Sequence, residues 1–140
     1  MASTLYLKGI EQMMLGEIDL VADTIKLKYM ATSYTPAPTT ESWLSDVSAS
    51  EEAGAPTETL ASKAVTIDAA NSRVEFDAAD VTENSITCST NKFIIYKDTG
   101  VAATSPRIAC IDIAEGTLAP VSGTISITFN AQGIFAVTPS

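Results

Sequence analysis

Apolar side chains recur at helical spacing near the N-terminus of the chain. Four residues would line one face of a short helix: Tyr6, Ile10, Met13 and Met14. A hydroxyl of Ser3 or Thr4 would cap its first turn, and Gly16 would end it in the left-handed conformation. The pattern predicts one helix that packs on its own domain, with a helix that docks on a partner as the alternative.

After Gly16 the apolar spacing changes to two, which is the period of a half-buried strand. Ile25, Leu27 and Tyr29 alternate with lysines. Similar apolar runs follow near 65–67, 74–76, 81–88, 93–96, 108–113, 125–129 and 134–137. Turn residues separate the runs, and no segment between them is long enough for a helical crossover. The pattern predicts an all-β, antiparallel β-sandwich of about eight strands, jelly-roll-like, with a short N-terminal helix. We expect residues 1–140 to form one domain.

Residues 34–56 interrupt the strand pattern. Prolines and acidic residues stand there among many Ser and Thr, and the stretch contains no Lys or Arg. This composition predicts a long loop excursion out of the sheet, with one short element around Trp43. We expect Trp43, the only Trp of the chain, to anchor the loop to the domain, with a contact to a partner as the alternative.

The charge balance excludes several classes of function. The chain has 17 acidic and 8 basic residues, a formal net charge of −9 and no His. This charge opposes binding to nucleic acid and to anionic membranes, so neither is expected as a partner. The missing His removes the commonest general base and the commonest metal ligand. No apolar run is long enough to span a membrane, and Met1-Ala2-Ser3-Thr4 lacks the basic region of a secretory signal, so we expect synthesis in the cytoplasm of a cell.

The remaining reactive residues do not form a recognisable catalytic pattern. Cys88 and Cys110 are expected as buried free thiols, although a disulfide between their strands stays open. Two carboxylate pairs are formal candidates for glycoside hydrolysis: Asp77 with Asp80, and Glu17 with Asp19. Asp is also common in ordinary turns, which makes Ca²⁺ binding there equally unspecific. We therefore expect a protein that is not an enzyme, with no catalytic residues, no cofactor and no metal.

Several blocks of sequence, in order over most of the chain, form a further pattern. They are Leu5-Tyr6-Leu7-Lys8-Gly9, Gly16-Glu17-Ile18-Asp19, Asp23-Thr24-Ile25-Lys26, Ile95-Tyr96-Lys97-Asp98-Thr99-Gly100, Arg107-Ile108-Ala109-Cys110-Ile111-Asp112, Gly123-Thr124-Ile125-Ser126-Ile127-Thr128 and Gly133-Ile134-Phe135. In these blocks the chain resembles the cement (capsid decoration) proteins of tailed bacteriophages, in particular those of Bordetella-type short-tailed phages. Residues 34–56 depart from the pattern of that family.

The resemblance implies a jelly-roll β-sandwich in the virion, on the outer surface of an icosahedral capsid. It implies a homodimer that clamps neighbouring major capsid proteins, and it implies no catalytic residues. Four residues are candidates for capsid or dimer contacts: Tyr6, Ile10 and Met14 on the helix face, and Trp43 in the long loop. A self-complementary patch for the dimer would come from an exposed strand edge or from the helix.

Two other roles stay open. A head-fibre or tail-associated module that binds a host receptor or carbohydrate would need aromatic and polar side chains together on loops at one end of the sandwich. The aromatic residues available on long loops are Tyr34 and Trp43, so the cement role is favoured. A tail or connector subunit of the same particle is the closer alternative.

Overall fold

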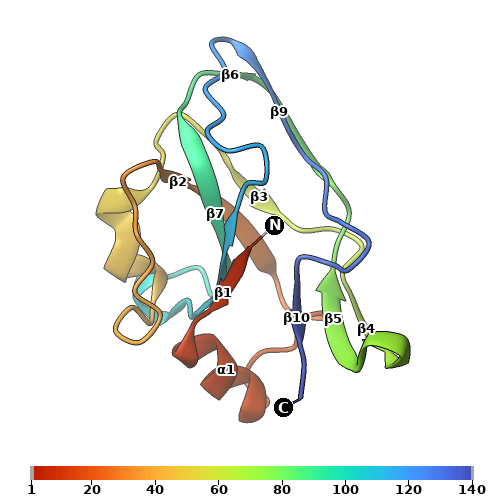
Figure 1. The fold of residues 1–140 in the computed structure, drawn as a ribbon. Helices are drawn as coiled ribbons and strands as arrows, with labels where there is room; N and C mark the ends of the chain where they lie inside the picture. Colours follow the sequence, from red (N-terminus) through yellow and green to blue (C-terminus); the bar gives the residue numbers. More distant parts are fainter. Residues whose placement is uncertain (1, 140) are drawn as a thin grey trace.

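The larger layer of the molecule is a five-stranded antiparallel sheet. The computed structural model describes residues 2–139. The order of strands across the sheet is β1 (Ser3–Leu5), β8 (Arg107–Asp112), β7 (Thr90–Lys97), β2 (Ile25–Ala31) and β3 (Thr57–Thr59) (Figure 1). Each neighbouring pair is antiparallel. The long central strands β7 and β2 are buried through most of their length, as expected for a strand covered on both faces.

Two smaller antiparallel sheets make the opposite layer (Figure 1). One contains β10 (Phe135–Val137), β5 (Arg73–Asp77) and β4 (Ala64–Asp68), and the other pairs β6 (Val81–Ile86) with β9 (Gly123–Ile127). The main hydrophobic core lies between the layers, with Leu27 and Phe93 from one and Phe76 and Ile125 from the other. Edge-to-face packing of Phe93 on Phe129, with ring centroids 6.2 Å apart, is one contact across this core.

The structure confirms the all-β sandwich with a short N-terminal helix. Each of the eight expected strand runs corresponds to a strand, and the alternation is clearest in β9, where Ile125 and Ile127 are buried and Ser126 is exposed. Residues 2–139 contain two more strands, β1 and β3, of three residues each. Such segments are too short to show a period in the sequence. The jelly-roll connectivity stays a prediction.

The N-terminal helix α1 (Leu7–Met14) begins later than predicted. Ser3 and Thr4 lie in β1 rather than at a helix cap, and Tyr6 occupies the cap position without a hydrogen bond from its side chain to the helix. Pairing with β8 takes up these residues, because the N–H of Tyr6 donates to the carbonyl of Ile108. The predicted end is confirmed, since Gly16 has φ +75° and its N–H donates to the carbonyl of Met13.

The excursion at 34–56 covers the other face of the five-stranded sheet. It contains the 3₁₀ helix η1 (Leu44–Ser50), the short element expected around Trp43; two further 3₁₀ turns are η2 (Ala69–Asn71) and η3 (Ala102–Thr104). Val47 of η1 and Tyr34 pack with Met30, Ile94 and other buried residues in a second hydrophobic cluster. The five-stranded sheet is therefore the middle layer of the molecule, with the main core on one face and this cluster on the other.

The close approach of α1 to β8 generates a test of the fold. A Cβ added at Gly9 would lie 2.6 Å from the carbonyl oxygen of Arg107 and 2.7 Å from Cα of Ile108. Gly to Ala inside a helix normally stabilises by up to about 1 kcal/mol. Here we expect Gly9→Ala to lower the free energy of unfolding by about 1–3 kcal/mol, because the helix must move away from β8.

Urea denaturation followed by circular dichroism measures this change, with Gln12→Ala as a control on the same helix. An unchanged or increased stability of Gly9→Ala would contradict the close packing of α1 on β8.

Candidate functional site

A fully buried arginine, Arg107, lies under the excursion at the start of β8. The register of β8 against β7 places its side chain there. Ile95 pairs with Ala109 and Tyr96 pairs with Arg107, so Ile108 is an extra residue in β8, a β-bulge. The bulge puts Arg107 on the same face as Cys110 instead of the main-core face. The sheet thus buries a permanent positive charge beneath the loop.

Three side chains interact with the guanidinium group of Arg107. Nη2 of Arg107 lies 2.8 Å from Oε2 of Glu41, and Nη1 donates to the hydroxyl of Tyr34 at 3.1 Å. The guanidinium carbon lies 4.2 Å from the ring centroid of Tyr6, a cation–π contact. Nε has no hydrogen-bond partner among the described residues, so the ring of Tyr6 compensates only part of its lost hydration.

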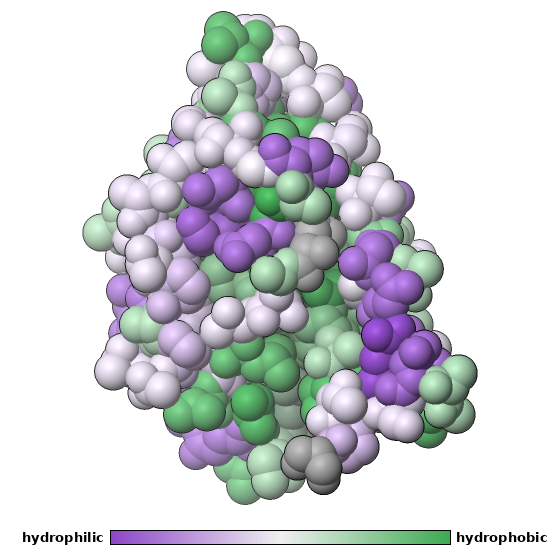
Figure 2. Space-filling view, in the orientation of Figure 1, coloured by the Kyte–Doolittle hydropathy of each residue, from purple (hydrophilic) through white to green (hydrophobic). Residues whose placement is uncertain are grey.

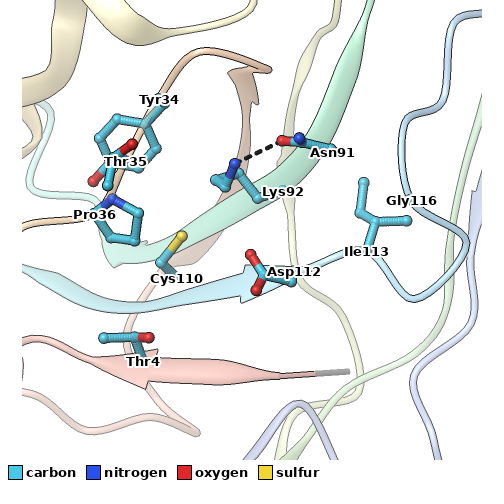
Figure 3. Close-up of a pocket in the computed structure, with 10 residues that line it drawn as sticks. All are labelled: Thr4, Tyr34, Thr35, Pro36, Asn91, Lys92, Cys110, Asp112, Ile113 and Gly116. Atoms are coloured by element: carbon cyan, nitrogen blue, oxygen red, sulfur yellow. Dashed lines mark hydrogen bonds between the residues drawn. The ribbon is translucent and has the colours of Figure 1, made fainter.

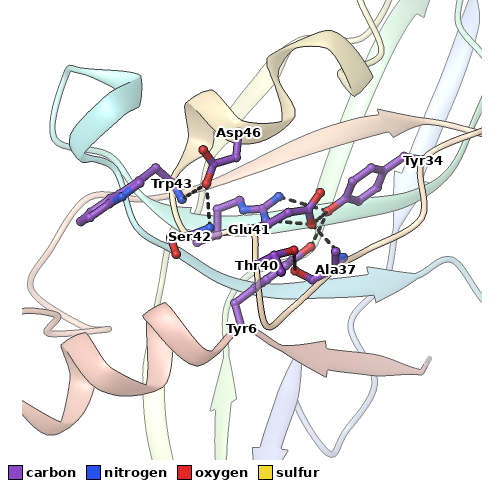
Figure 4. Close-up of polar contacts among 9 residues, drawn as sticks. Tyr6, Tyr34, Ala37, Thr40, Glu41, Ser42, Trp43 and Asp46 are labelled. Atoms are coloured by element: carbon purple, nitrogen blue, oxygen red, sulfur yellow. Dashed lines mark hydrogen bonds and ion pairs between the residues drawn. The ribbon is translucent and has the colours of Figure 1, made fainter.

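Glu41 is the acceptor at the centre of the network (Figure 4). Its Oε2 accepts hydrogen bonds from the hydroxyl of Tyr34 at 2.7 Å and from the N–H of Ala37 at 2.8 Å. The hydroxyls of Tyr34 and Tyr6 are 2.6 Å apart. Burial raises the pKa of Tyr34 to about 12 and raises the pKa of Tyr6 still further. Both phenols therefore stay protonated and serve as hydrogen-bonding partners for the ion pair.

The next turn of the excursion is held by Asp46. Its Oδ2 accepts the N–H groups of Ser42 at 2.7 Å and Trp43 at 2.9 Å (Figure 4). These two backbone hydrogen bonds are the main reason that the pKa of Asp46 is lowered. The N–H of Leu44 donates to the carbonyl of Ser105, and that of Arg107 donates to the carbonyl of Ser42. The excursion is consequently attached to the sheet by main-chain as well as side-chain bonds.

The four residues predicted as contacts have different environments. Tyr6 has no exposed surface, so its assignment as a contact residue is wrong: the phenol is used within the chain, in the Arg107 network. Ile10 and Trp43 are half-buried, and the ammonium of Lys8 lies 5.0 Å from the ring centroid of Trp43. Met14 is 83% exposed at the end of α1. Of the residues predicted at the helix, Met14 is therefore accessible at the surface and Tyr6 is not.

Sequence analysis missed the pairing of Glu41 with Arg107. One signal was present: a stretch with several acidic residues and no Lys or Arg must find any buried cation partner elsewhere in the chain. The sequence did not show which cation. Arg107 stands in an apolar strand where ordinary alternation would have grouped it with Ala109 and Ile111.

A shallow open hollow of about 450 Å³ lies on the part of this sheet face that the excursion leaves uncovered (Figure 3). Tyr34, Thr35 and Pro36 stand on one side of it and Ile113 on the other, with Cys110 and Asp112 between them. Burial raises the pKa of the Cys110 thiol to about 12, so the thiol is neutral and a poor nucleophile. The hollow could bind a ligand through its shape and through hydrogen bonds, and the Cys110 thiol in it is not activated for attack.

Among the other chemical candidates, the two cysteines are buried, and Asp80 and Asp19 bind the main chain. Cys88 and Cys110 are both free and buried, which confirms the prediction of unpaired thiols. Oδ1 of Asp80 accepts the N–H of Phe129, and Oδ1 of Asp19 accepts two N–H groups in its own turn. Among residues 2–139 no group of three or more Cys, Asp or Glu side chains is placed to hold a metal ion. No helix in the described part of the chain is long and apolar enough to cross a membrane.

Two carboxyl groups, Glu58 of β3 and Glu83 of β6, interact where the two layers meet. Burial and the neighbouring Glu58 carboxyl raise the pKa of Glu83 to about 7. At neutral pH the Glu83 carboxyl, at the contact between the layers, is therefore close to the midpoint of its titration.

Comparison with protein-family models, with curated proteins and with solved structures gives no match for this chain.

The buried ion pair generates the second test. Glu41→Ala leaves Arg107 buried without its counter-charge, and we expect a loss of about 3 kcal/mol in the free energy of unfolding. Adding Arg107→Met removes the uncompensated charge, so the double variant is expected to be more stable than Glu41→Ala alone. Glu51→Ala is the matched control, because Glu51 pairs with Lys28 at 3.5 Å near the surface of the same excursion and should cost less than about 1 kcal/mol.

Urea denaturation followed by circular dichroism measures the global stability of the three variants. The fluorescence of Trp43, the only Trp, reports release of the excursion. A double variant no more stable than Glu41→Ala would show that the charge of Arg107 is not what the excursion neutralises.

The Glu58–Glu83 pair generates a test of pH dependence. In the folded chain the pKa of Glu83 is about 7, above the ordinary value of 4.5. The folded chain therefore holds the proton on Glu83 more tightly than the unfolded chain does. The resulting stabilisation is full below the unfolded value and is lost as the pH rises through the folded value. We expect stability to fall between about pH 5 and about pH 8, and Glu83→Gln to reduce that fall.

Urea midpoints at the two pH values measure the effect, with Glu115→Gln in an exposed turn as the control. The same pH dependence in Glu83→Gln and in the unmodified chain would exclude Glu83 as its source.

Proposed function

We propose that the chain is a virion structural protein, a cement or decoration protein that binds the outside of an icosahedral phage capsid. In this role it clamps neighbouring major capsid proteins and acts as a homodimer. The sequence blocks that resemble the cement family support the proposal. They fall on framework elements such as β8 and β9 and the junction of β1 with α1. The excursion, which departs from the family pattern, lies outside this framework.

One structural observation carries the proposal furthest: large apolar side chains are exposed at and beside α1. Leu7, Met14 and Leu15 at α1 are 56%, 83% and 65% exposed. Figure 2 shows hydrophobic surface over α1 and the neighbouring region of the molecule. Exposed apolar surface of this kind suits docking on another protein. A small-molecule site would instead enclose its ligand in a deep pocket.

The proposed mechanism is mechanical. A protein bound across two capsid subunits must be released before the subunits separate, so its binding free energy adds to theirs. Many copies on one shell multiply this effect, even when each copy buries a modest area. The network of Arg107 and Glu41 supports this role, because a rigid excursion loses little conformational freedom on binding.

A recognition module for a host receptor or carbohydrate is the second candidate. Of the two loop aromatics that would serve it, Tyr34 is buried and bonded to Glu41, and Trp43 is half-buried beside Lys8. The sequence predicted no other aromatic residue on a long loop that could form a recognition site with these two. The cement role is therefore preferred, with a tail or connector position in the same particle as a further alternative.

Co-sedimentation with capsids of the same phage that lack this chain tests the proposal. We expect saturable binding at a fixed ratio to the capsid protein and a higher melting temperature of the capsid. Met14→Lys should weaken binding by about tenfold or more, since it places a charge in an apolar contact. Val121→Lys is the matched control, because Val121 is 81% exposed in a loop and Met14 is 83% exposed.

Absence of capsid binding, together with binding of the chain to host cells or to tails, would overturn the proposal. Equal binding by Met14→Lys and Val121→Lys would leave the capsid role in place and remove α1 as the contact.

A further inference from the structure

Strand β4 is a free edge of the three-stranded sheet. It lies at one end of the order β10, β5, β4, with β5 on its inner side (Figure 1). Within residues 2–139 its main chain pairs with β5 alone. Residues 64–67 are exposed and Asp68 is half-buried. The outward N–H and C=O groups of β4 are therefore available for another strand.

This edge lacks the features that usually protect a free strand. It contains no Pro and no Lys, and its five residues pair with β5 without a register shift. Its one charge, Asp68, lies 3.0 Å from Nη2 of Arg73, a cation that it shares with Glu75. The edge strands β1, β3 and β10 have only three residues each, and the pairing of β6 with β9 contains a bulge. Among these strands β4 is the longest edge that stays regular and nearly uncharged.

Two apolar rows cross the three-stranded sheet on one face. Cross-strand pairing puts Val137, Val74 and Ile67 in one row, and these residues are 49%, 41% and 81% exposed. The neighbouring row contains Phe135, Phe76 and Val65; its two phenylalanines are buried in the core and Val65 is 45% exposed. The apolar face of the sheet thus continues past the core of the domain to the β4 edge.

We propose that β4 pairs antiparallel with β4 of a second copy of this chain, about a two-fold axis at Thr66, to form a continuous six-stranded sheet. This arrangement sets Val65 opposite Ile67 of the second copy, and Ile67 opposite its Val65. The exposed row of one copy then continues into the partly buried row of the other. Each of the two combined rows across the dimer contains six apolar residues. The edge is therefore complementary to itself, as a two-fold interface requires.

A hollow beside the edge receives the incoming side chain. A depression of about 370 Å³ next to Val65 is lined by Met13, Ile18 and Leu20. Directly opposed side chains in an antiparallel pair have Cβ atoms about 4.5–5.5 Å apart. Ile67 of the second copy, the most exposed residue of the row, would consequently reach this hollow, and the symmetry repeats the contact on the other side.

The charge of the chain sets the conditions for this pairing. Each copy has a net charge of −9, so two copies repel each other at long range and added salt should favour the dimer. Close to the edge Arg73 pairs with both Asp68 and Glu75, so it offsets part of the local negative charge. The inference rests on the dimeric part of the proposed function, and capsid binding is measured separately because a monomer can also bind.

Analytical ultracentrifugation of the purified chain at increasing NaCl concentration tests the pairing. We expect a dimer whose dissociation constant falls as salt rises. Ile67→Lys should raise that constant by about tenfold or more, because Lys on an edge opposes strand pairing. Val121→Lys, at the same 81% exposure in a loop, should leave it unchanged. A monomer at every salt concentration, or equal dimers from both variants, would overturn the inference.

A cysteine cross-link tests the two-fold axis. Residues opposed across an antiparallel pair have Cα atoms about 4.5–5.5 Å apart, which is within the range of a disulfide. Thr66→Cys should therefore give a covalent dimer on mild oxidation, since Cys88 and Cys110 are buried. Ser126→Cys, exposed in the middle of β9, is the control. A covalent dimer from Ser126→Cys alone would overturn the β4 pairing in favour of β9.

Co-sedimentation with capsids, applied to the cross-linked Thr66→Cys dimer, separates the two proposals. A dimer that forms through β4 and fails to bind capsids contradicts the cement role alone. A monomer that binds capsids contradicts the β4 pairing and the homodimer, and it leaves the capsid-binding role in place.

Discussion

The buried charge of Arg107 is the constraint on which the outer layer of this protein depends. A guanidinium without water must be matched by an anion and by hydrogen-bond acceptors. Glu41 and Tyr34 supply them from the excursion, and Tyr6 supplies an aromatic face from the junction of β1 with α1. Removing the excursion would expose one face of the central sheet and leave this charge unmatched. The loop is therefore a third layer of the fold rather than an appendage.

This arrangement separates the interior of the molecule from its contact surfaces. The phenols of Tyr6 and Tyr34, whose pKa values are raised by burial, are used within the fold. The exposed apolar residues gather instead on α1 and on the β4 edge, represented by Met14 and Ile67. In the described residues 2–139 the buried polar network therefore supports the fold, and the exposed apolar side chains lie apart from it. The two surfaces adjoin at Met13 of α1, which lines the hollow beside Val65 of β4.

Local sequence patterns predicted the fold more completely than the candidate site. The alternation of Ile125 and Ile127 with polar residues was enough to locate β9, and the positive φ of Gly16 followed from its place after an apolar helical stripe. The helix start was misplaced because Ser3 and Thr4 pair with β8. Pairing with a strand a hundred residues away leaves no periodic signal in a segment of three residues. The assignment of Tyr6 as a contact was wrong for a related reason, because the residue that buries it, Arg107, also lies about a hundred residues away in β8.

The sequence by itself determined the element types, because the period of apolar residues reflects the local geometry of helix and strand. It also determined the acidic charge and the absence of His. Only the tertiary structure decided that Ile108 forms a bulge, that Arg107 consequently faces the excursion, and that β4 remains an edge. These features depend on which distant strands pair and in what register. A one-residue change of register turns a side chain to the opposite face of the sheet while leaving the local pattern of the strand unchanged.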